Sequence, residues 1–162
     1  MALFGVTRRT TMAAALAVDQ MAITALTSRK LKVNEISLTG RGATSAAAEY
    51  QELAVVLATA ASVGASTALL LNKLEADSAA MQSFVSHTPA TTAHTITAGT
   101  ELFFIGCNVY GGIYRWTARP NGELVARSIA GSNLGGAGTI LYKNNTGSTT
   151  AIYSLHTVID EL

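Results

Sequence analysis

The stretch that decides the fold is residues 53–72, LAVVLATAASVGASTALLLN, which contains no charged side chain. As an α-helix it would be about 30 Å long, at roughly 1.5 Å per residue, which matches a bilayer core and also a helix of a bundle. Its length therefore does not distinguish a membrane span from a helix buried in an assembly. The kind of protein depends on what covers this segment.

Apolar spacing around this segment favours a long helix. When Leu53 is placed at heptad position a, apolar side chains recur at the a and d positions as far as residue 84. The apolar face extends to position e, and this width suits three or more helices. We expect helices over residues 10–30 and about 44–85. The side chains expected in an oligomer core are Leu53, Val56, Val63, Leu70, Leu74, Met81 and Phe84.

After His87 the chain becomes rich in Thr and Gly, and short β-like runs alternate with turn residues. The pair Asn121-Gly122 predicts a hairpin with a type I′ turn. We therefore expect an α+β protein, in which an N-terminal helical oligomerisation region with a long Ala-rich helix precedes a small antiparallel β-sandwich or barrel. The expected parts are a helical docking and oligomerisation region (1–86), a linker (87–99) and a small β-domain (100–162).

Composition also points to an assembly. The chain has 162 residues, of which 49% are hydrophobic and 13% are charged, more apolar material than one small water-facing domain needs. The net charge of +1 does not indicate a specific nucleic-acid binder. Residues 1–41 carry an excess of positive charge, which is either a solvated face or a contact with a polyanion.

The residues that usually carry chemistry do not form a catalytic pattern. The single Cys107 excludes an intramolecular disulfide framework, and its apolar neighbours indicate a buried thiol. The histidines His87, His94 and His156 lack the spacing of a zinc site. No nucleophile elbow, phosphate-binding loop or dinucleotide-binding motif is present. We therefore predict that the protein is not an enzyme and has no catalytic residues, cofactor or metal.

One segment concentrates aromatic side chains. The run NVYGGIYRWTAR contains Tyr110, Tyr114 and Trp116, which together with Arg115 are candidates for a surface that binds a sugar ring. Tyr114 and Trp116 have the same parity, so in a strand they would share one face. That face is either a binding platform or part of the core.

Two C-terminal stretches, TITAGTELFFIGCNVYGG and GTILYKNNTGSTTAIYSLHTV, resemble the small β-domains of structural proteins in tailed bacteriophages. The resemblance covers residues 95–158 and rests on a TxxAGT step into a first core strand and an NxxGSxxA turn between two late strands. It implies a head fibre, capsid decoration protein or short tail fibre, with no catalytic residues.

Three functions are therefore open. The first is a structural virion protein that forms a homo-oligomer, preferably a trimer, docks on the capsid or tail by its N-terminal part and displays a β-domain. The second is a single-span membrane protein anchored by residues 53–72. The third is a carbohydrate-binding attachment module that contacts a host surface glycan through Tyr110, Tyr114 and Trp116.

Overall fold

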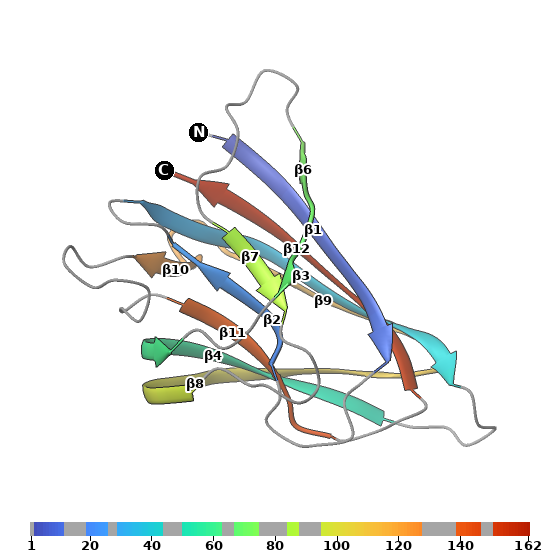
Figure 1. Cartoon of the computed structure of the whole chain (residues 1–162). Helices are drawn as coiled ribbons and strands as arrows, with labels where there is room; N and C mark the ends of the chain where they lie inside the picture. The colour runs from blue at the N-terminus through green and yellow to red at the C-terminus, as the bar shows by residue number, and fades with distance from the viewer. Residues whose placement is uncertain are drawn as a thin grey trace.

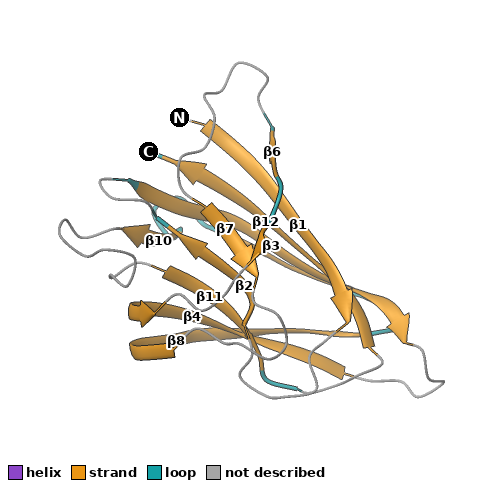
Figure 2. Cartoon of the chain, in the orientation of Figure 1, coloured by secondary structure: helices purple, strands orange, loops and turns teal. Residues whose placement is uncertain are grey.

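A computed structural model describes residues 2–11, 19–25, 29–43, 50–62, 67–74, 84–87, 95–127, 139–146 and 151–162. Every regular element in these ranges is a β-strand (Figure 2). The strands are β1 (Ala2–Thr11), β2 (Asp19–Thr24), β3 (Lys30–Ala43), β4 (Tyr50–Ser62), β5 (Thr67–Ala68), β6 (Leu71–Lys73), β7 (Phe84–His87), β8 (Thr95–Asn108), β9 (Ile113–Thr117), β10 (Leu124–Arg127), β11 (Thr139–Asn144) and β12 (Ala151–Glu161).

The strands pair in a nested order. β1 pairs with β12, β2 with β11, β3 with β9 and β10, and β4 with β8, all antiparallel. These nine strands thus form one long hairpin, in which β9 and β10 follow each other along one edge of β3. Further pairing of β12 with β3 and of β11 with β4 rolls this hairpin into two sheets. This strand order is that of a jelly roll.

Three short strands extend the two sheets on one side. They come from the connection between β4 and β8, and β6 pairs with β1 while β7 pairs with β2 and β5 with β7. Figure 1 shows the two ends of the chain side by side, because β1 and β12 are neighbours in the first sheet. The additions cover edges of β1 and β2 that would otherwise present unpaired backbone groups.

The main core lies between the two sheets. Its side chains alternate along each strand, as expected for a sandwich. Burying one such Val, Leu or Ile contributes roughly 1.5–3 kcal/mol. The largest fully buried side chains are Tyr142, Tyr153, Phe4, Met21, Ile23, Leu31, Ile36, Leu38, Leu53, Ile105 and Ile140.

Strand β4 is buried on both faces. Leu53 and Val55 point into the main core, whereas Ala54 and Val56 belong to a second buried cluster with Ala22 and Leu141 on the opposite face of the sheet. A strand buried on both faces has a continuous apolar sequence without alternation of polar residues. Such a run resembles a buried helix when it is judged by sequence pattern alone.

The expected α+β class is therefore wrong, because the structure has two antiparallel sheets and no helix in the residues that it describes. The coiled coil is likewise not supported. Residues 53–62 of the stretch taken as a helix belong to β4. In the part of the chain that is described, no helix is both long enough and apolar enough to span a bilayer. Strands from both sides of the expected 87–99 linker share each sheet.

The residues expected in the oligomer core do not form one seam. Leu53 and Val56 are buried on opposite faces of β4, whereas Leu70 and Leu74 are 80% and 50% exposed. Phe84 lies in β7, where its backbone is paired with Thr24. Val63 and Met81 lie outside the described residues.

Strands β8–β12 coincide with β-like runs identified in the sequence, but the expected hairpin at Asn121-Gly122 is absent. β9 and β10 do not pair with each other, because both pair with β3. The turn between them has a hydrogen bond from Gly122 N to Arg119 O (2.8 Å) and a φ of 63° at Asn121. With Pro120 at its second position, this is a type II turn rather than type I′.

Two buried tyrosines carry polar groups into the core. The Tyr153 hydroxyl donates a hydrogen bond to Gln20 Oε1 (2.6 Å), and the Tyr142 hydroxyl accepts one from Thr157 (3.4 Å). Burial raises the pKa of both phenols above the usual 10.0. The charge of Arg8 opposes this shift of the pKa at Tyr153, and the Thr157 hydrogen bond opposes it at Tyr142.

We expect the free energy of unfolding to fall as the pH rises above about 10, where tyrosines of the unfolded chain ionise. The native state holds these protons more tightly, so the stability that they contribute is complete below that pH and is lost above it. Tyr153→Phe and Tyr142→Phe should each weaken this alkaline loss in urea unfolding followed by circular dichroism. Tyr110→Phe, at an exposed position, is the control. An alkaline loss unchanged in both core variants would contradict this explanation.

Candidate functional site

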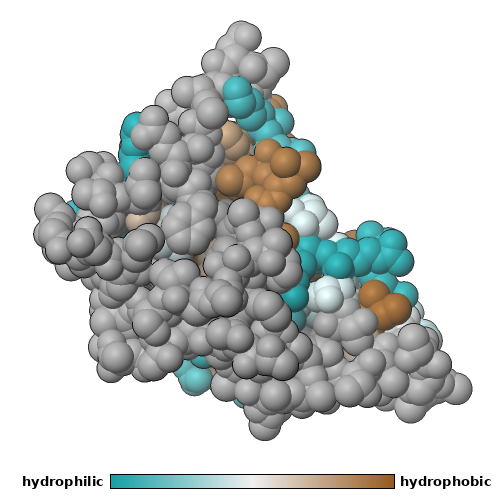
Figure 3. Space-filling model, viewed as in Figure 1, coloured by the Kyte–Doolittle hydropathy of each residue, from teal (hydrophilic) through white to brown (hydrophobic). Residues whose placement is uncertain are grey.

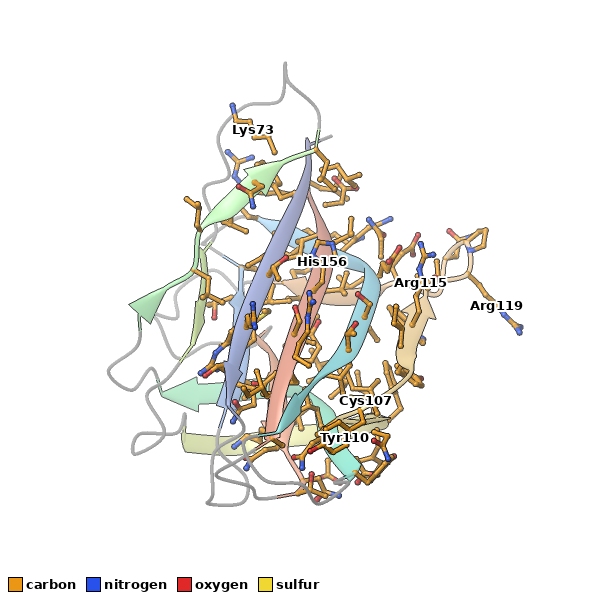
Figure 4. The ribbon with its side chains drawn as sticks, turned by 90° about the vertical axis from the view of Figure 1, so that its right-hand side faces the viewer. Lys73, Cys107, Tyr110, Arg115, Arg119 and His156 are labelled. Carbon is orange, nitrogen blue, oxygen red and sulfur yellow. The ribbon has the colours of Figure 1, made fainter. Side chains whose placement is uncertain are left out.

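The chain turns from β8 into β9 at a corner of the sandwich, and a pocket of about 340 Å³ lies there. Figure 4 shows Cys107 and Tyr110 near each other at this corner, far from Lys73. The pocket combines residues from the start of β4, the end of β8, the turn and the start of β9. Its lining residues are Tyr50, Gly106, Cys107, Asn108, Gly111, Gly112, Ile113 and Tyr114.

Strand β3 holds the backbone of this corner in place. Gly42 N donates a hydrogen bond to Val109 O (2.6 Å), and a Cβ atom at Gly40 would lie only 2.3 Å from Asn108 O. Within the turn, Asn108 Oδ1 accepts a hydrogen bond from Tyr110 N (2.9 Å). The close approach of the two backbones requires glycine at position 40, and it makes the corner a fixed support for the pocket.

The ring of Tyr50 lies across Gly106. A Cβ atom at Gly106 would be 2.1 Å from Tyr50 Oη and 2.5 Å from Cζ, so only glycine permits this position of the ring. Tyr50 is nevertheless 58% exposed, so its hydroxyl end lies against Gly106 while much of the side chain is accessible to solvent. The pKa of Tyr50 is raised mainly by desolvation of its hydroxyl, and in second place by the nearby Glu52 carboxylate.

A carboxylate is held beside this ring. Glu52 Oε2 accepts a long hydrogen bond from the Tyr50 hydroxyl (3.5 Å), and Glu52 Oε1 accepts one from Asn145 Nδ2. The backbone of the β11–β12 turn is also attached, since Asn145 N donates to Glu52 O and Glu52 N donates to Thr146 Oγ1, both at 2.8 Å. These bonds orient Glu52 and Asn145 next to the pocket.

Cys107 forms part of the pocket wall but is only 6% exposed. Burial raises the pKa of its thiol, and a backbone hydrogen bond from Gly40 reduces that rise. A thiol with a raised pKa carries little of the thiolate that acts as a nucleophile. Its position in the main core fits the packing interpretation made from the sequence.

The aromatic residues singled out in the sequence do not form one platform. Tyr114 and Trp116 point inward from β9 and pack against the main core, whereas Ile113 and Arg115 point outward. The Trp116 ring lies 5.4 Å from that of Phe103, tilted by 30°. Tyr114 also borders the corner pocket.

Tyr110 is 53% exposed on the corner turn, so it alone of the three is a surface aromatic. Trp116 borders a second pocket of about 460 Å³, together with Arg115, Thr117, Arg119 and Gly122.

Sequence reasoning missed Tyr50 and Glu52 because it assigned them to a helix. No alternation marked this strand, because every residue from Leu53 to Leu57 is apolar. The pairing of β4 with β8 is what brings Tyr50 to the corner, where its register partner is Asn108.

A row of polar side chains crosses the outer face of the first sheet. Thr7, His156, Ser37 and Arg115 are successive register partners across β1, β12, β3 and β9. Thr7 Oγ1 lies 2.8 Å from His156 Nδ1, and Arg115 Nη2 lies 2.7 Å from Glu35 Oε2. Among the described residues, no three His, Cys, Asp or Glu side chains are grouped in a way that could hold a metal ion.

Comparisons of the chain with protein-family models, with curated proteins and with solved structures find no match. The resemblance of residues 95–158 to structural proteins of tailed bacteriophages therefore stays a prediction from the sequence.

Substituting Gly40→Ala should lower the free energy of unfolding by roughly 1–3 kcal/mol, because the added methyl group meets the backbone of Asn108 and Val109. Gly111→Ala is the matched control, since a Cβ atom there meets no other atom within 4 Å. Urea unfolding of both variants measures the difference. Equal stabilities would show that β3 does not support the corner.

Substituting Trp116→Ala should lower the free energy of unfolding by roughly 2–4 kcal/mol. This is somewhat less than the loss for a completely buried ring, because Trp116 is only partly buried. Arg115→Ala, the neighbour on the opposite face, should change the stability much less, because Arg115 is exposed and an ion pair at the surface contributes little. Thermal unfolding of the two variants tests this contrast. A Trp116→Ala protein as stable as the wild type would restore the surface interpretation of this side chain.

Proposed function

We propose that this chain is a structural protein of a bacteriophage virion that assembles as a homo-oligomer, preferably a trimer. The observation that carries the proposal is the jelly-roll strand order, an architecture used by viral capsid and lectin domains. Because one fold serves many functions, the fold supports this role only by analogy. The phage-like sequence of residues 95–158 supports it independently.

The surfaces of the two sheets suit a subunit that faces water on one side. The outer face of the first sheet carries the Thr7, His156, Ser37 and Arg115 row, whereas the outer face of the second sheet holds the buried cluster around Val56. Figure 3 shows an apolar patch at the surface near β6, next to polar side chains. The polar sheet would then be the displayed face of the particle.

Contact between copies is best placed at β6. Leu70 and Leu74 flank this three-residue strand, which is the end strand of the first sheet, and they are 80% and 50% exposed. Exposed leucines beside a sheet edge usually mark an interaction surface. Both leucines were expected in the oligomer core from the sequence. In this proposal they still contact another copy of the chain, but through a sheet edge and without a coiled coil. The proposed partners of the oligomer are capsid or tail proteins.

A carbohydrate-binding attachment function is the second candidate. It is favoured by one specific observation, the exposed ring of Tyr50 beside the Glu52 carboxylate at the corner pocket. The two roles are compatible, because an attachment protein of a virion is also a structural component of it.

The purified chain should have a native mass three times its 16.8 kDa in the absence of detergent, as measured by native mass spectrometry and sedimentation. A double variant, Leu70→Asp with Leu74→Asp, should shift the population to single chains. Association would bury the two new carboxylates without a cationic partner, and burial of an unpaired charge is costly. Leu102→Asp on β8 is the matched control and should leave the assembly intact. A single-chain mass for the wild type at all concentrations would rule out the oligomer.

Association with particles is tested separately. Virions purified by density gradient should contain the chain in amounts comparable to other minor structural proteins, as quantified by mass spectrometry. Recovery only in the unassembled fraction would overturn the virion assignment.

A further inference from the structure

We propose that the corner pocket binds a pyranose sugar, with the exposed ring of Tyr50 as its stacking platform. The proposal rests on the geometry of the corner and does not require the virion assignment. It replaces the set Tyr110, Tyr114 and Trp116, of which two members pack against the core.

The first requirement of a sugar site is a fixed aromatic ring with a free face. The Tyr50 ring has its hydroxyl end against the backbone of Gly106 and is 58% exposed. A ring that is already immobilised loses little conformational entropy when a ligand stacks on it. The apolar C–H face of a pyranose ring can pack against the apolar face of the phenol ring, as other apolar groups pack against aromatic side chains.

The second requirement is a set of polar groups for the hydroxyl rim of the sugar. The Glu52 carboxylate, oriented by the Asn145 amide, can accept hydrogen bonds from hydroxyl groups through its remaining lone pairs. Asn108, whose side chain accepts the Tyr110 N–H bond, is exposed at the pocket and has an amide group that can donate. Acceptors and donors are thus both available next to Tyr50.

None of the described residues that line the pocket is charged, and the nearby Glu52 carboxylate disfavours phosphates and acidic ligands. Its volume of about 340 Å³ lies at the lower end of the roughly 300–1,000 Å³ typical of small-molecule sites. This size suits one sugar ring. Ile113 in the lining and Tyr110 on the adjoining turn are 68% and 53% exposed, so further units of a glycan chain could contact them.

Glycines keep this space open. Gly112 has a φ of +88°, a conformation that side chains rarely adopt, and a Cβ atom at Gly111 or Gly112 would meet no atom within 4 Å. Because Gly111 lines the pocket, a leucine there is expected to fill part of this space. Gly111→Leu is therefore the variant chosen to block the site.

The test is a titration of the full chain, labelled with nitrogen-15, against glucose, galactose, mannose, rhamnose and N-acetylglucosamine in separate NMR experiments. At least one sugar should shift the amides of Gly106, Gly111 and Gly112 in a saturable manner. Tyr50→Ala should weaken that binding by about tenfold, the value of one aromatic contact, whereas Tyr50→Phe should stay within about threefold of the wild type. Gly111→Leu should abolish the shifts.

The control is Phe104→Ala, which removes an aromatic side chain on β8 that is 47% exposed and lies outside the pocket lining. Its sugar affinity should equal that of the wild type. The proposal is overturned if none of the five sugars shifts the corner amides, or if Tyr50→Ala and Gly111→Leu bind as well as the wild type. Such a result leaves the virion assignment standing, because particle association is measured without any sugar.

Discussion

The double burial of β4 is the constraint on which the rest of the structure depends. This strand lies between β8 and β11 in the second sheet, with the main core on one face and the cluster of Ala54 and Val56 on the other. A shift of its register by one residue would exchange the two faces and put Leu53 and Val55 on the side where Ala54 and Val56 now pack. The register of β4 is therefore strongly specified, and it fixes the positions of the side chains on this strand.

The corner pocket inherits its geometry from that register. Tyr50 and Glu52 are the first residues of β4, and their positions opposite Asn108 and Gly106 follow from the pairing with β8. Two close approaches then fix the corner, the Tyr50 ring on Gly106 and the backbone of Gly40 on Asn108. A ligand site made in this way is supported by strands and hydrogen-bonded turns, which gives it little freedom to change shape.

The surface of the molecule divides into parts with different chemistry. The first sheet presents hydroxyl, imidazole and guanidinium groups to water, and the leucines beside β6 are apolar side chains that the described fold leaves exposed. The corner pocket is separate from both. A displayed polar face, a contact between copies and a recognition site are compatible in one jelly-roll subunit, because each uses a different edge or face.

By itself the sequence determined the local properties of the chain. Strands over most of residues 95–161, the shared face of Tyr114 and Trp116, and the burial of Cys107 follow from alternation, turn residues and apolar neighbours, whereas the structure decided that this face points inward. Only the tertiary structure decided that residues 53–62 form a strand, since covering both faces of a strand removes the alternation that distinguishes it from a helix. It also decided the pairing of β1 with β12 and the meeting of Tyr50 with Gly106, because contacts between residues far apart in the chain depend on how whole sheets pack and leave no periodic trace in the sequence.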